Sequence, residues 1–184
     1  MRFFVAVFWE FVQNLPPTAG FVAAVWLWRQ QSKKKALVCI VVGSTVGSLL
    51  IRFTESTINN IVEPMHVTVI NLISFSLGML LFTSYLGTES PSKWSNWKGD
   101  LVFGGGMGFL IGMSQALATG GVHIVAAIIH SLAMALPIPL VLISVRMLSK
   151  SVSTFQAALM RSVPIATAMT IVIGLVDYTY LLFL

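Results

Sequence analysis

Six long apolar stretches, separated by short polar segments, constrain this chain more than any other feature of its sequence. A helix needs about 20 mainly apolar residues to cross the hydrocarbon core of a bilayer. The stretches are Phe3–Trp28, Ala36–Phe53, His66–Tyr85, Leu101–Ala118, Val122–Leu148 and Phe155–Leu184. Long segments of alternating polarity, which are typical of outer-membrane barrels, are absent from the sequence. The sequence therefore predicts an all-α polytopic membrane protein with six transmembrane helices.

The composition excludes the other common protein classes. Hydrophobic residues make up 57% of the chain and charged residues only 9%, whereas soluble domains carry about 25% charged residues. Disordered chains are polar and rich in charge, and a single cysteine, Cys39, rules out a disulfide scaffold. The longest polar connection, Gly87–Asp100, is too short for a soluble domain. We therefore interpret residues 1–184 as a single transmembrane domain.

The distribution of Lys and Arg predicts the orientation of the spans. Nine of the eleven basic residues lie in or beside the first, third and fifth connections, and basic residues mark the cytoplasmic side of a membrane protein. We expect a multi-pass protein of the cell membrane with both termini extracytoplasmic. The net charge of +5 follows from this topology signal, so the bilayer is the expected partner and nucleic acid is not. Arg146 and Arg161 are expected to extend to the inner headgroups.

Polar and small residues recur along the chain at intervals of about 60 residues. Asn14, Asn71 and His130 are 57 and 59 residues apart, and Gly43 and Gly47 match Gly104 and Gly108 at a spacing of 61. This spacing is typical of three pseudo-repeated helical hairpins around a central path. The alternative is that apolar helices of low complexity align by chance.

The two Gly-x-x-x-Gly pairs also predict where helices pack closely. Gly43 and Gly47 lie in the second stretch, and Gly104 and Gly108 lie in the fourth. Glycines at this spacing let helix backbones approach each other. Self-association, or passage of a solute beside the exposed backbone, is the alternative role of these faces.

The first stretch holds the strongest candidate for a functional site. An ionisable residue inside a membrane span is a functional candidate by default, and Glu10 lies one helical turn before Asn14. Pro16 and Pro17 then remove two backbone N–H donors, so we expect a broken helix with free carbonyl groups. Together these groups predict a cation or proton site. The alternative places Glu10 in the outer headgroup zone and reduces the prolines to a kink.

Other intramembrane polar residues extend this predicted pathway. His123 and His130 share one helix face but stand about 10 Å apart along the axis, too far to ligate one metal ion directly. They suit either a proton or solute path or hydrogen-bonded helix packing. Arg52 is expected to form an ion pair with Asp177 or Glu10. The complete predicted pathway for substrate or ion consists of Glu10, Asn14, Asn71, His123, His130 and Asp177.

Catalytic patterns are scarce in the sequence. No Gly-x-Ser-x-Gly motif occurs, and the acids and histidines do not cluster as metal-dependent and phosphoryl-transfer enzymes require. We expect no enzymatic activity, no cofactor and no metal site. An enzyme that acts on a lipid through His130 or Glu10 is the least favoured alternative.

The leading functional hypothesis is a small transporter or channel subunit that moves a small solute or ion through the six-helix bundle. A second hypothesis rests on Ala19-x-x-x-Ala23, which resembles the coupling motif of the vitamin-binding membrane subunits of energy-coupling-factor transporters. That resemblance implies six spans and separate energy-supplying partner proteins, although those subunits keep both termini inside. A third hypothesis is a non-transporting assembly or scaffold subunit, either a homo-oligomer or bound to a partner membrane subunit through its glycine faces.

Overall fold

The computed structural model describes residues 2–58, 60, 64–88, 97–118, 124–148 and 152–182, and within these ranges it contains helices and no strand. The helices are α1 (Arg2–Arg29), α2 (Lys33–Ile58), α3 (Met65–Thr88), α4 (Trp97–Ala118), α5 (Ile124–Met134), α6 (Pro137–Leu148) and α7 (Phe155–Leu182). Each of the six predicted stretches is helical over its described residues, except that the fifth is divided between α5 and α6. The prediction of an all-α membrane protein is confirmed.

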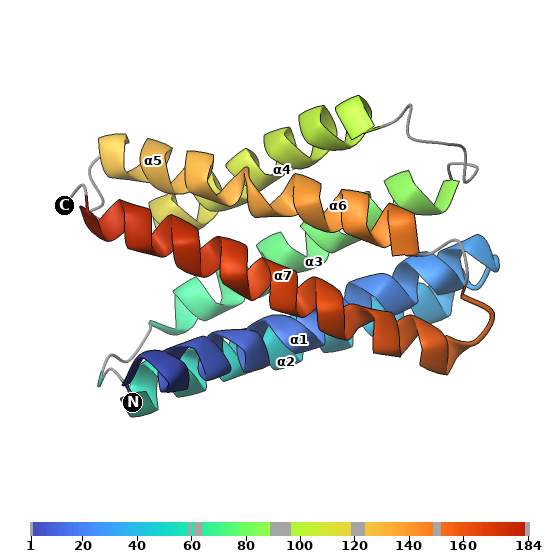
Figure 1. Ribbon diagram of the computed structural model, residues 1–184, viewed down its shortest axis with the longest axis horizontal. Helices are drawn as coiled ribbons and strands as arrows, with labels where there is room; N and C mark the ends of the chain where they lie inside the picture. The colour runs from blue at the N-terminus through green and yellow to red at the C-terminus, as the bar shows by residue number, and fades with distance from the viewer. Residues whose placement is uncertain are drawn as a thin grey trace.

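The helices lie lengthwise against one another, and the chain passes back and forth along the bundle (Figure 1). The helix α1 begins and α7 ends at the same end of the bundle, which we call the termini end. The opposite end, where α1 leads into α2, carries most of the described basic residues, and we call it the basic end. Its basic residues are Arg29, Lys33, Lys34, Lys35, Lys98, Arg146 and Arg161.

Four segments of the described chain are long and apolar enough to cross a membrane. They are Lys33–Thr57, Met65–Thr88, Ile124–Leu148 and Phe155–Leu175. The outer surface of the bundle is also apolar, since large hydrophobic side chains such as Val42, Leu110 and Ile171 are more than half exposed. Such a surface is suited to contact with lipid tails rather than with water. Length, composition and surface therefore agree on membrane insertion.

The interrupted helix is not the one that the sequence predicts. The helix α1 runs continuously from Arg2 to Arg29 through Pro16 and Pro17, so the expected break in the first span is wrong. The interruption lies between α5 and α6, at residues 135–136, directly before Pro137. Proline suits the first helical position because the N–H group that it lacks has no partner within the helix there. The end of α5 is closed by hydrogen bonds from the next two backbone N–H groups to carbonyls of its last turn.

Glycines bring α2 close to the proline segment of α1. A Cβ atom on Gly43 would lie 2.8 Å from the carbonyl oxygen of Pro16, and one on Gly47 would lie 3.0 Å from the ring of Pro17. On the α1 side, a Cβ on Gly20 would lie 2.5 Å from the carbonyl oxygen of Cys39. Real Cβ atoms essentially never lie as close as the distances at Gly20 and Gly43, so the contact requires glycine at these two positions, and it is tight at Gly47. The neighbouring helix thereby packs directly on the segment where α1 lacks two backbone donors.

A second glycine stripe lies on α4 and packs against the interruption between α5 and α6. A Cβ on Gly108 would lie 2.6 Å from the carbonyl oxygen of Met134, and one on Gly104 would lie 3.0 Å from the Cα atom of Pro139. The structure thus places all four glycines of the predicted pairs at close helix contacts. The α2 stripe faces the preceding helix, whereas the α4 stripe faces the following one. These contacts are not equivalent, so the three-hairpin repeat stays a prediction.

The core of the bundle is organised around α1, which packs against α2, α3 and α7. The second half of α1 supplies much of the buried apolar surface, including Phe21, Ala24 and Val25. The helix α6 contributes Leu142 and Val145 to the same core. Because the polar residues of α1 lie on the same helix, nearer its beginning, this arrangement brings them beside the interior of the bundle.

Candidate functional site

A cavity of about 80 Å³ lies in the middle of the bundle, between α1, α2, α3, α4, α6 and α7. A cavity of this size has room for several water molecules or one small solute, because a single water needs about 10–15 Å³ by the same measure. Its polar side chains come from α1 and α2 only: they are Gln13, Asn14, Thr18, Ser44 and Ser48. The cavity therefore has one polar side, built by the first helical hairpin.

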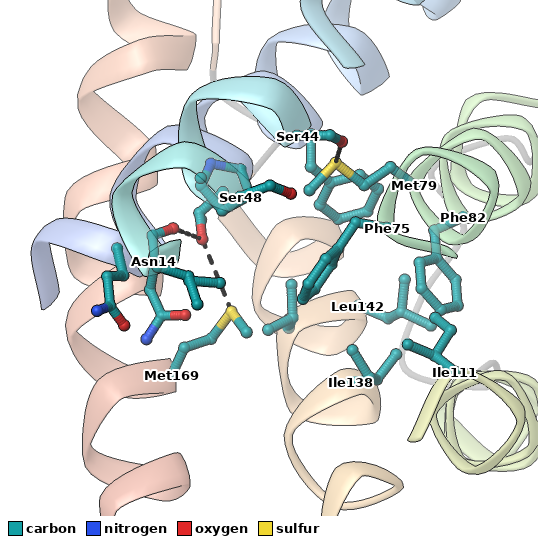
Figure 2. A pocket seen from close by; sticks show the side chains of 17 residues that line it. Asn14, Ser44, Ser48, Phe75, Met79, Phe82, Ile111, Ile138, Leu142 and Met169 are labelled. Carbon is teal, nitrogen blue, oxygen red and sulfur yellow. Dashed lines mark hydrogen bonds between the residues drawn. The ribbon is translucent and has the colours of Figure 1, made fainter. Parts of the chain in front are cut away.

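The opposite side of the cavity is apolar. Figure 2 shows Phe82 and Leu142 across the cavity from Asn14, while Met79, on α3 like Phe82, lies beside Ser44. The first turn of α6, directly after the interruption, contributes Ile138. None of the seventeen described residues that line the cavity carries a charge. The space is therefore amphipathic and electrically neutral.

The hydroxyl group of Ser48 is the most informative group in this cavity. Its side chain is 4% exposed, and its Oγ atom has no hydrogen-bond partner among the described residues. The neighbouring Ser44 differs, because its hydroxyl donates to the sulfur of Met79 at 3.4 Å (Figure 2). An unsatisfied buried hydroxyl costs about 1–3 kcal/mol. A molecule in the cavity that offers a polar atom to Ser48 would recover that free energy.

Hydrogen bonds connect the polar side of the cavity to Glu10 and to α7. The amide Nδ2 of Asn14 donates to Glu10 Oε1 at 3.1 Å and lies 3.5 Å from Thr170 Oγ1. The hydroxyl of Thr18 donates to the backbone carbonyl of Asn14 at 2.7 Å, and its Oγ1 atom lies 3.7 Å from the sulfur of Met169 (Figure 2). Glu10 itself does not line the cavity, but Asn14 joins its carboxylate to the lining.

Of the six residues in the predicted pathway, the structure brings two together. Glu10 and Asn14 are hydrogen-bonded, and Asn14 lines the cavity. Asn71 on α3 and His130 on α5 are half-buried at other positions and do not line it. The side chains of His123 and Asp177 lie outside the residues that the structure describes. Among the four described residues of the predicted pathway, only the two on α1 are connected to the cavity.

Arg52 has a different contact from the predicted ion pair. Its Nη1 atom donates to the sulfur of Met65 at 2.8 Å, at the start of α3. Glu10, the described one of its two predicted partners, accepts from Asn14 instead. Arg52 therefore links α2 to α3 at the termini end, and the alternative pairing with Asp177 involves a side chain outside the described residues.

A buried ion pair at the basic end was not predicted from the sequence. Arg146 on α6 donates to both carboxylate oxygens of Asp100 on α4, with its Nε at 2.7 Å and its Nη2 at 2.5 Å. Asp100 is fully buried, and the Arg146 side chain is 10% exposed. The expectation that Arg146 extends to the headgroups is therefore wrong, because its guanidinium turns inward. The guanidinium also lies 5.6 Å from the centre of the Tyr85 ring.

One sequence signal points to this ion pair in retrospect. Asp100 lies at the start of the fourth apolar stretch and Arg146 near the end of the fifth. Consecutive antiparallel spans bring these two positions to the same end of the bundle. The positive-inside rule accounts for Arg146 as a marker of the cytoplasmic side. It does not predict which side chain Arg146 contacts.

The residues around the cavity offer hydroxyl and amide groups rather than metal ligands. In the described ranges, no three His, Cys, Asp or Glu side chains lie close enough together to hold a metal ion. The chemistry available in the cavity is hydrogen bonding to a small molecule beside an apolar wall. No protein-family model, curated protein or solved structure matches the chain.

Proposed function

We propose that the chain is a small membrane transport protein, a transporter or channel subunit, whose central cavity takes up a small neutral solute. The observation that carries this proposal is the buried, unpartnered hydroxyl of Ser48 in a cavity without charged lining residues. The cavity draws on the middle of several helices and borders an interrupted one, as solute sites of membrane transporters do. The solute would be partly apolar, with one hydrogen-bonding group facing α1 and α2.

The lining favours a neutral solute over an ion. An ion that leaves water must be surrounded by compensating charges or by several oriented oxygen atoms. The polar side chains of this cavity lie on one side, opposite the wall that contains Phe75 and Leu142. An ion in that space would have oxygen ligands on one flank only, whereas an amphipathic molecule would satisfy both sides.

Flux through reconstituted vesicles tests this proposal. We would measure osmotic swelling with urea, acetamide and glycerol as neutral solutes, and uptake of Rb⁺ as the ion. Swelling with at least one neutral solute should be faster than in protein-free vesicles. Ser48→Leu, which fills the cavity, should abolish the difference, while Gly106→Ala should retain it because the space around Gly106 is open. Movement of Rb⁺ alone, or of none of these solutes, would contradict the proposal.

Glu10 is the proposed coupling residue beside the cavity. Its carboxylate bonds to Asn14, which lines the cavity, so a change in its protonation alters a lining side chain directly. Glu10→Gln removes the charge and retains an oxygen acceptor for Asn14. We expect this variant to keep its stability and to lose solute flux. Normal flux through the Glu10→Gln variant would show that Glu10 does not take part in transport. The role of the cavity would then be tested by Ser48→Leu alone.

The motifs that suggested a capture subunit or a scaffold make contacts within the bundle. Ala23, the second residue of Ala19-x-x-x-Ala23, is 1% exposed, so this motif does not form an open surface for a coupling protein. Gly43 packs on α1 and Gly108 on the end of α5, so the two glycine faces are not open to partner helices. These contacts favour a transport role over a capture subunit or a scaffold.

A further inference from the structure

A second pocket opens at the basic end of the bundle, between α1, α6 and α7. Its volume is about 190 Å³, and it is separate from the central cavity. Arg29, the last residue of α1, and Arg161, in the second turn of α7, both line it. Two arginines from helices that are far apart in the sequence thus line one pocket.

Hydrogen bonds to neighbouring backbone carbonyls define the positions of Arg29 and of Trp26, which lines the same pocket. The Nη2 atom of Arg29 donates to the backbone carbonyl of Leu86 at 3.1 Å, and the indole of Trp26 donates to the carbonyl of Val152 at 3.3 Å. None of the ten described residues that line the pocket is acidic. Asp100, on α4, is already bound through both oxygens by Arg146. The described lining of the pocket therefore includes two basic residues and no acidic one.

The rest of the lining distinguishes this pocket from a purely polar anion site. Val22, Val145 and Ile165 make part of the lining apolar, and Trp26 also lines the pocket. Tryptophan is enriched where the hydrocarbon core meets the headgroups. A ligand that fills this pocket would place an anionic group against the arginines and apolar carbon atoms against the apolar part of the lining.

We propose that this pocket binds a phosphate group, carried by an anionic phospholipid whose first acyl carbons lie along the apolar part of the lining. Guanidinium groups bind phosphate oxygens through paired hydrogen bonds, and basic pockets between helices at a membrane face bind lipid headgroups. A soluble phosphate compound offers the same anionic group without the acyl chain. This site is distinct from the central cavity and does not depend on the proposed transport function.

Lipid binding to the purified full chain tests this proposal. Native mass spectrometry in detergent would measure binding of dioleoyl phosphatidylglycerol, with dioleoyl phosphatidylcholine and inorganic phosphate as separate probes. The variants are Arg161→Gln and the double variant with Arg29→Gln. Lys34→Gln is the matched control, because Lys34 is an exposed basic residue at the same end of the bundle. Arg161→Lys keeps the positive charge. It provides a conservative variant for comparison if a Gln variant does not fold.

We expect phosphatidylglycerol to bind the unmodified chain more tightly than phosphatidylcholine. Each basic residue contributes about fivefold to such affinity, so the double variant should bind about 25-fold more weakly. Lys34→Gln should bind as the unmodified chain does, and Arg161→Lys should fall in between. Binding of inorganic phosphate that weakens in the same arginine variants, without a preference for phosphatidylglycerol over phosphatidylcholine, would support a phosphate site. It would contradict the proposal that a lipid carries the phosphate. Equal binding of both lipids by all variants would overturn the proposal.

Discussion

A buried polar group at the basic end and one in the central cavity differ in their hydrogen bonding. At the basic end, the carboxylate of Asp100 accepts two hydrogen bonds from one guanidinium. In the cavity, the hydroxyl of Ser48 is buried without a partner, and no charged side chain reaches the lining. A satisfied ion pair therefore joins α4 to α6, whereas a hydroxyl without a hydrogen-bond partner among the described residues lines the central cavity. The ion pair at the basic end is thus expected to stabilise the bundle, whereas the neutral cavity is the proposed site for a small solute.

The largest expected effect is the loss of the buried ion pair at the basic end. Arg146→Met leaves the carboxylate of Asp100 buried and unpaired, and breaking one partner of such a pair costs about 3–5 kcal/mol. Thermal unfolding in detergent should show a lower midpoint for this variant. Arg52→Met is the matched control, because Arg52 bonds only to the sulfur of Met65 among the described contacts, and its midpoint should change little.

The double variant Asp100→Leu with Arg146→Met sharpens this test. It removes both charges, so much of the lost stability should return, since an apolar pair of similar volume often replaces a buried ion pair at little cost. If Arg146→Met unfolds at the temperature of the unmodified chain, the ion pair does not stabilise the basic end and the comparison fails there.

A smaller loss is expected at the glycine stripe that carries the interrupted helix. Gly108→Ala places a Cβ atom 2.6 Å from the carbonyl of Met134, and such overpacking costs about 1–3 kcal/mol. Gly106→Ala makes the same chemical change in the same helix, where a Cβ meets no atom within 4 Å. The unfolding midpoint should fall for the first variant and not for the second. Equal midpoints would show that α4 and α5 do not approach as closely as described.

The smallest expected effect on stability is at the cavity itself, where two hydroxyls can be compared. Thr18→Val removes a hydroxyl that donates to the carbonyl of Asn14, and loss of a hydrogen bond costs about 1 kcal/mol. Ser48→Ala removes a hydroxyl without a partner, so its unfolding midpoint should stay the same or rise. A clear loss of stability in Ser48→Ala would mean that this hydroxyl is bonded within the protein, and the contrast with the basic end would then disappear.

Hydrophobic runs and local spacing predicted much of this structure from the sequence. The long apolar stretches became helices because a bilayer requires internally bonded backbone. Glu10 and Asn14 are four residues apart, and on a helix this spacing alone makes them neighbours. The glycine pairs predicted close helix contacts for an equally local reason.

Features that depend on the packing of distant helices were not predicted. Pro16 and Pro17 remove backbone donors wherever they occur, but whether the helix breaks depends on its neighbours, and Gly43 and Gly47 bring α2 against this segment. The face that α2 turns inward decides that Ser48 lies in the cavity, and serine is too common in helices to stand out. The pairing of Asp100 with Arg146 joins residues 46 positions apart, a relation without a local sequence pattern.

Chemical labelling at position 48 is the most direct test of the claim that small neutral molecules reach the central cavity. In a Cys39→Ala background, Ser48→Cys would be exposed to methyl methanethiosulfonate, which is neutral, and to a cationic trimethylammonium analogue, in vesicles. Thr83→Cys is the control, because Thr83 is fully buried and does not line the cavity. We predict rapid modification of residue 48 by the neutral reagent, slower modification by the cationic one, and none of residue 83. Absence of modification at residue 48, or equal reaction at both positions, would contradict the account.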